Sequence, residues 1–156
     1  MSAQASEKSE NVKRSLFNYI VSNYTETALQ FQGSEVIDTT ALSEWVWFGI
    51  TGIVARIFMR DASKTEHADL ATYLVTAEIN VKPTTTITRP SAIADVVRNL
   101  LRRPAISVVD YAGAGSGEVG KLNGWGVMSE VELPIENDLR KYVITFQMRY
   151  LEKYAI

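Results

Sequence analysis

Residues 71–81 read ATYLVTAEINV, and apolar side chains alternate with polar ones there except at Leu74. Successive side chains of a strand point to opposite faces, so this alternation is typical of a strand with one buried face. The apolar positions of the stretch are Tyr73, Val75, Ala77, Ile79 and Val81. We predict a half-buried strand here and expect the remaining elements to be arranged around it.

The segment on its N-terminal side completes a hairpin. Residues 45–60, WVWFGITGIVARIFMR, are rich in aromatic and β-branched side chains, which favour an extended conformation. Gly49 and Gly52 indicate a bulge or turn inside this strand. Residues 61–68 are expected to form the polar turn of the hairpin, and residues 29–32 could add a short strand before it.

The C-terminal half predicts three more strands. We expect them at residues 105–111, 125–133 and 142–152, with a Gly-rich loop at 112–124. The last strand has a clear apolar face, formed by Tyr142, Ile144, Phe146, Met148 and Tyr150.

Two amphipathic helices are expected beside these strands. Residues 9–24 place Val12, Leu16 and Ile20 on one helical face. A second helix follows Pro90, with Ser91 as its cap and Pro104 beyond its end. Its apolar stripe is Ile93, Val96, Val97, Leu100 and Leu101. The pattern predicts an α+β fold in the order α-β-β-α-β-β-β, with two helices packed on one largely antiparallel or mixed sheet.

Length and composition limit the class of protein. The chain has 156 residues, 46% of them hydrophobic and 22% charged, which fits one domain at 9–156 after a flexible end at 1–8. A formal charge of −2 argues against a nucleic-acid-binding domain. Without cysteine, disulfides and thiolate metal sites are excluded. Apolar runs are too short for a signal peptide or a bilayer span, so we expect no membrane contact.

The Gly-rich loop contains two patterns found in phosphate-binding loops. Gly115-x-Gly117-x-x-Gly120 follows a predicted strand, and Gly115 to Lys121 also spells G-x-x-x-x-G-K. Both motifs need a following helix whose N-terminus faces the phosphate. Here the chain continues into a predicted strand, and Leu122 replaces the hydroxyl that would hold Mg²⁺. We therefore favour a hairpin loop, and a small nucleotide-binding enzyme remains the remote alternative.

Other candidate sites are weaker. His67, the single histidine, lies between Glu66 and Asp69 and could belong to a metal trio, but a polar turn favours a surface residue. Glu130 and Glu132 share one strand face and could act as an acid and a base. Carboxylates on the solvent face of a sheet are usually only solubilising. We predict no catalytic, cofactor-binding or metal-binding residues.

The aromatic residues favour a binding surface. Trp45 and Trp47 lie on one side of their predicted strand, while Val46 and Phe48 lie on the other. Two helices in so small a domain would struggle to cover both faces of a sheet. Because exposed aromatic patches often mark interfaces, we expect part of this surface to contact another chain.

The order of these elements resembles the tail terminator proteins of long-tailed bacteriophages. The resemblance covers residues 10–150: the N-terminal helix, the strand with Trp45-Val46-Trp47-Phe48, its hairpin partner, the helix at 91–101, GWGVMSEVELP at 124–134 and YVITFQM at 142–148. Two strands after the loop exceed the single terminal strand expected in some members. This family has no catalytic residues, so none are transferred.

The resemblance implies a structural role in the virion, which is assembled in the host cytoplasm. Members form a ring, usually a hexamer, that caps the tail tube protein and offers a docking surface to the neck or head-completion protein, while DNA passes through the lumen without specific binding. Another neck, tail-completion or tail-tube subunit is the alternative. The residues expected at assembly contacts are Trp45, Trp47, Asp61, Glu66, Thr85, Arg89, Gly113, Gly115, Gly117 and Lys121.

Overall fold

The computed structural model describes the backbone of residues 9–34, 37–60, 66–83, 87–102, 104–111, 117–136 and 138–155, and the side chains of these ranges except 51–60, 66–69, 136 and 151–155. The expected flexible end at 1–8 lies outside them. The elements in chain order are α1 (Ser9–Asn23), β1 (Ala28–Phe31), β2 (Glu44–Arg60), β3 (Glu66–Val81), α2 (Arg89–Leu101), β4 (Ala105–Val109), β5 (Glu118–Glu136) and β6 (Leu139–Ala155).

The strands form one six-stranded sheet in the order β1-β2-β3-β6-β5-β4. Every neighbouring pair is antiparallel except β1 with β2. The expected α+β class with two helices and one largely antiparallel sheet is confirmed. The predicted strand order is incomplete, because Ala28–Phe31 forms a sixth strand. Phe31 explains its stability: its ring lies 4.8 Å from that of Phe17 on α1 and 6.2 Å from that of Phe48 on β2.

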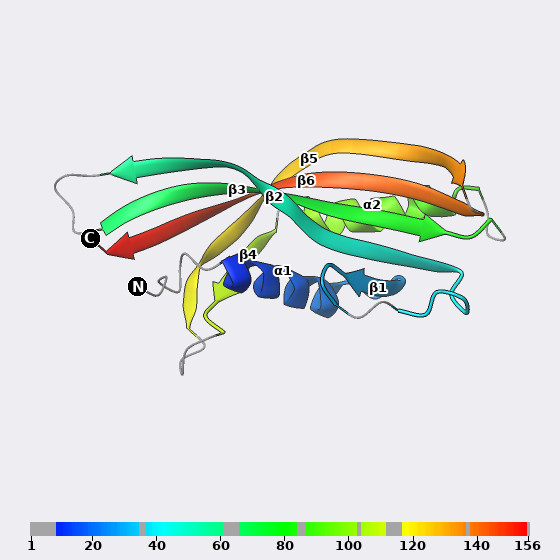
Figure 1. Ribbon diagram of the computed structural model, residues 1–156, viewed down its shortest axis with the longest axis horizontal. Coiled ribbons are helices and arrows are strands. Elements are labelled where there is room, and N and C mark those ends of the chain that lie inside the picture. The colour runs from blue at the N-terminus through cyan, green and yellow to red at the C-terminus, as the bar shows by residue number, and fades with distance from the viewer. Residues whose placement is uncertain are drawn as a thin grey trace.

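Both helices pack on the same face of the sheet (Figure 1). The apolar side chains predicted to share one face of β3 are all buried, and so are those predicted for β6 from Ile144 to Tyr150. They form a single core with Val12, Leu16 and Ile20 of α1 and with Ile93, Val97 and Leu101 of α2. The period-two and helical patterns in the sequence therefore located this core correctly.

The start of α2 differs from its prediction. Thr88 is the N-cap residue, although its side chain makes no capping bond, and Pro90 and Ser91 lie inside the first turn. Proline fits a first turn because the amide hydrogen that it lacks would have no helical partner there. In the apolar stripe, Val96 is exposed and Ala94 is buried instead.

Several strands are longer than the sequence pattern indicated. β3 begins at Glu66 and β5 at Glu118, so the predicted polar turn at 61–68 and the predicted loop at 112–124 both shrink. The ends of β2, β3 and β6 run past both helices as a three-stranded extension (Figure 1). The register of β2 with β3 shifts beside Gly52, as expected for a bulge, but stays regular at Gly49.

Arg89 joins the start of α2 to the sheet. Its Nε and Nη2 donate to the two carboxylate oxygens of Glu44 at 2.8 and 2.6 Å, and its Nη1 donates to Glu26 at 2.9 Å. Glu44 is largely buried, and the hydrogen bonds from Arg89 lower the pKa of its carboxyl. Such a bidentate, charge-assisted pair fixes both partners in one geometry.

We predict that Glu44→Gln lowers the free energy of unfolding at pH 7 by about 1–3 kcal/mol, because a charge-assisted contact at a partly buried site is lost. A carboxyl whose folded pKa is lowered stabilises the fold above the ordinary glutamate pKa, and this contribution disappears as the pH falls through the lowered value. Urea unfolding from pH 7 to pH 3 should therefore show wild type and variant converging toward low pH.

The matched control is Glu10→Gln, which removes an exposed carboxylate paired with Arg14 at 3.1 Å on α1. Exposed helix pairs contribute about 0.5 kcal/mol or less, so this change should be small. A gap between wild type and Glu44→Gln that stays constant over the whole pH range would contradict the ionic role of Glu44.

Gly120 is required where the ring of Tyr150 crosses β5. A Cβ at Gly120 would lie 2.5 Å from Tyr150 Cε2, and Tyr150 is fully buried. We predict that Gly120→Ala destabilises the fold by about 1–3 kcal/mol, as other overpacking substitutions do. Gly117→Ala is the control, because nothing lies within 4 Å of its added Cβ. Equal urea midpoints for the two variants would contradict this packing.

Candidate assembly surface

The far half of β5 carries most of the exposed apolar side chains in the described part of the chain. Large hydrophobic residues are exposed at ten described positions, and six of these lie on β5: Trp125, Val127, Met128, Val131, Leu133 and Ile135. The exposed fractions of Trp125, Met128 and Ile135 are 58%, 59% and 60%. An exposed apolar stretch of this kind is typical of a surface that binds another protein.

This exposure arises because β5 is longer than its neighbour β4. β4 pairs with residues 118–123 of β5, and the hydrogen bond from Gly124 N to Pro104 O at 2.8 Å is the last backbone contact on that side. Within the described residues, 125–135 make no other backbone hydrogen bond on this outer edge. Among the residues that the structure describes, the strand therefore presents unpaired peptide groups next to exposed apolar side chains, which is a template for strand addition.

The helices give this edge little cover. Arg98 of α2 reaches Glu130, where Nε donates to the carboxylate, and it also pairs with Asp95 on its own helix. These carboxylates raise the pKa of Arg98. Glu130 and Glu132 share one face of β5, as predicted, because the register pairs them with Ile144 and Tyr142. That face is the one on which α2 packs, so Glu130 is held by Arg98 and is not merely solubilising.

The free edge is partly bulged and partly regular. Its register with β6 shifts between Gly124 and Gly126 and between Val127 and Ser129, and Gly126 has a φ of 128° that disfavours other residues. From Ser129 to Leu133 the register runs without interruption. Bulges twist an edge away from pairing, so the regular run 129–133 is the part best shaped to accept a strand.

The helix-free face of the sheet extends from β5 to Trp45 and Trp47, the two tryptophans predicted to be contact residues. The register places Trp47, Glu78, Val143 and Val131 in one row across β2, β3, β6 and β5. Trp45, Asn80, Lys141 and Leu133 form the next row. Lys141 Nζ binds Glu78 Oε1 at 3.0 Å in the middle of these rows. The face is therefore apolar toward both sides and ionic at its centre.

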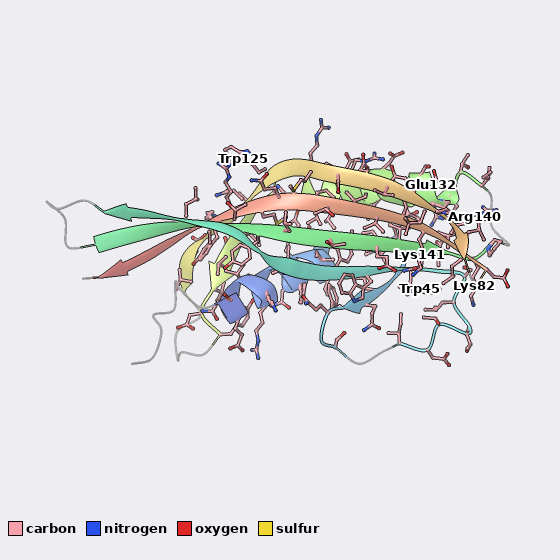
Figure 2. All side chains as sticks on the ribbon, turned by 45° about the horizontal axis from the view of Figure 1, so that its top comes forward. Trp45, Lys82, Trp125, Glu132, Arg140 and Lys141 are labelled. Carbon is pink, nitrogen blue, oxygen red and sulfur yellow. The ribbon has the colours of Figure 1, made fainter. Side chains whose placement is uncertain are left out.

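Trp125 lies against Arg149 at the start of the free edge. The guanidinium carbon of Arg149 lies 4.0 Å from the centroid of the Trp125 ring, a cation–π contact. Arg149 Nε is buried and has no hydrogen-bond partner among the described residues. Trp125 lies far from the end of the sheet where Trp45, Lys82 and Lys141 gather (Figure 2). Tryptophan is a frequent anchor of protein interfaces.

Trp45 lines an open groove at that other end of the sheet. The groove has a volume of about 550 Å³ and is lined by Thr39, Thr40, Trp45, Lys82, Pro83, Asp138 and Leu139. Lys82 Nζ donates to the carbonyl oxygens of Thr39 and Thr40 at 2.9 and 3.1 Å. The ammonium group of Lys82 is thus bound by backbone carbonyl groups of the same chain.

The other predicted contact residues lie in different places. Trp47 is half-buried, and its ring covers Gly49, where a Cβ would clash with it. Arg89 is engaged by Glu44 and Glu26 within the fold. Lys121 binds Ser107 Oγ at 3.2 Å and Glu118 Oε1 at 3.0 Å, and Gly117 is exposed. The backbone of Glu66 lies in β3, while Asp61, Thr85, Gly113 and Gly115 lie outside the described residues.

The remaining sequence motifs have the following outcome. Gly120 and Lys121 belong to β5, so a strand follows Gly117, as predicted, where a phosphate-binding loop needs a helix. His67 lies in β3 and not in a turn. The described residues contain no cluster of three potential metal ligands and no helix long and apolar enough to cross a membrane.

Sequence reasoning missed β5 as the main candidate surface. The alternation of Val131 and Leu133 with Glu130 and Glu132 predicts a strand but not its neighbours. One signal was present in the sequence: residues 125–135 contain six large apolar side chains, on both faces of the predicted strand. The comparisons add no relative, since no family model and no curated protein matches this sequence.

Proposed function

We propose that this chain is a structural subunit that assembles into a closed ring. The observation that carries the proposal is the far half of β5, with six exposed apolar side chains and an outer edge that no other described segment pairs with. Fully burying one such side chain contributes about 1.5–3 kcal/mol, whereas association costs about 4–15 kcal/mol in lost freedom. Several of the six must therefore be covered together, which favours an extended protein contact.

A ring rather than a pair is favoured by the asymmetry of the sheet. β5 lies near one side of the sheet and β2, with Trp45 and Trp47, near the other. A ring needs two different surfaces on each subunit, because each copy contacts one neighbour with one surface and the next neighbour with the other. The two sides of this sheet supply such a pair.

The resemblance to tail terminator proteins gives the ring its proposed place. In this proposal, the ring caps the tube of a long-tailed phage, stops its growth and offers a docking surface to the neck, while DNA passes through. The order of helices and strands supports it, with β1 as an addition to the expected pattern. A tube subunit is the second candidate, because an interface that does not close by rotation yields a filament.

Light scattering over a concentration series is expected to give one discrete mass that is a multiple of 17.4 kDa and does not grow further. Growth without limit would identify a tube subunit instead. A monomer at every concentration would contradict self-assembly and leave a partner-dependent neck protein.

Val131→Lys should raise the concentration at which the ring forms by about tenfold or more, since burying a cation in an apolar interface is unfavourable. Val21→Lys is the matched control: Val21 is 56% exposed on α1, away from β5. Assembly that weakens equally in both variants would contradict a specific role for β5.

A further inference from the structure

We infer that the subunits join by strand addition: the free outer edge of β5 accepts the free outer edge of β2 from a second copy of this chain. The inference rests on the proposed ring and names the surfaces that form it. It follows from four features of the described backbone and of the sequence, namely two unpaired edges, their directions, their charges and their positions in the sheet.

The acceptor is the edge of β5 beyond Gly124. There the backbone of residues 125–135 lacks a partner on its outer side within the described chain, and the side chains of 127–135 are all exposed. A partner strand would satisfy these peptide groups and cover Val131 and Leu133 on the helix-free face at the same time.

The donor is the edge of β2 beyond Ile50. β1 pairs only with Trp45–Phe48, after which Gln32 N donates to Phe48 O at 2.9 Å and Gln32 Oε1 accepts from Ile50 N at 3.0 Å. From residue 51 to Arg60 the described chain offers β2 no strand on that side, although β3 pairs with it on the other. β2 thus has an open edge on the side of the sheet opposite that of β5.

Strand directions allow the two edges to join without turning the second copy over. β2, β3, β6 and β5 alternate in direction along the sheet. The next copy, kept in the same orientation, presents its β2 antiparallel to β5 and so continues the alternation. Such an interface is head-to-tail, which is the type that a ring requires.

The charges of the two edges are complementary. Residues 124–136 contain Glu130, Glu132 and Glu136 and no lysine or arginine. Arg98 of α2 pairs with one of these carboxylates, that of Glu130. Residues 51–60 contain Arg56 and Arg60 and no acidic residue. Complementary charge favours this pairing over a pairing of β5 with β5, which would bring carboxylates together.

The two free edges lie at different positions along the strand direction, so neighbouring copies must be shifted relative to one another. The register places Val131 level with Trp47, whereas the centre of the free β2 edge is near Arg56, nine positions further along. Bringing Arg56 beside Val131 shifts the next copy by about 30 Å along the strands, at roughly 3.3 Å per residue. A sheet with such a shift closes only with its strands tilted to the axis, as in barrels.

Proline substitutions in adjacent positions test the pairing. Successive residues of a strand point their N–H groups to opposite edges. Of the two substitutions Val131→Pro and Glu132→Pro, one therefore removes an N–H group that points outward and the other removes one that points toward β6. The substitution that keeps the wild-type thermal unfolding is the β5-blocked variant. Ile57→Pro and Phe58→Pro yield the β2-blocked variant in the same way.

Each blocked variant alone is expected to be a monomer by light scattering, with at least a tenfold loss in apparent affinity. An equimolar mixture should give one species of twice the 17.4 kDa chain mass, because one variant supplies β2 and the other supplies β5. This complementation is specific to a head-to-tail pairing of these two edges.

Three results would overturn the inference. A dimer formed by the β2-blocked variant alone would show that β5 pairs with itself. A ring that survives both blocks would leave the proposed function standing but place the interface elsewhere. A wild-type chain that stays monomeric would remove the ring and the edge pairing together.

Discussion

Two helices are available to cover a six-stranded sheet, and both pack on the same face, around the alternate side chains of β3 and β6. Tyr73, Val75, Phe146 and Met148 lie at the centre of this core, and α1 and α2 complete it from one side. Neither helix covers the other face, so its own side chains must make it stable in water. It achieves this partly through the pair of Lys141 with Glu78, which lies between the tryptophans of β2 and the valine and leucine of β5.

The lack of covering elements in the described part of the chain also explains why the side chains in the far half of β5 are exposed. Its first residues pair with β4, but the strand continues for a further twelve residues after Gly124. Arg98 reaches it from α2, yet Trp125, Met128 and Ile135 stay more than half exposed. The strand pairs with β6 within the chain, but its outer edge and its exposed apolar side chains would be covered only in an assembly. We therefore regard the exposed strand as the feature that connects the fold to its proposed role. The register shifts at Trp125 and Met128 restrict where another strand can pair with it.

Local patterns in the sequence predicted much of the fold. The alternation at 71–81 and 142–152 located the core strands, and helical spacing located Val12, Leu16 and Ile20, because burial on one face leaves a period in the sequence. The missed features depend on contacts between distant segments. The short strand raised as a possibility at 29–32 is stabilised as β1 by Phe17 and Phe48, α2 has Thr88 as its N-cap without a side-chain bond, and the open edge of β5 depends on where β4 ends. No short window of sequence contains that information.

Amide hydrogen exchange of the β5 backbone, compared between dilute and concentrated protein, tests the central claim most directly. If β5 is the assembly surface, the amides of 125–135 whose N–H groups point outward exchange quickly in dilute solution and slow down as the protein assembles, while the core amides of β3 stay unchanged. If the exchange rates of 125–135 are the same at both concentrations although the mass increases, assembly uses another surface and the account is contradicted.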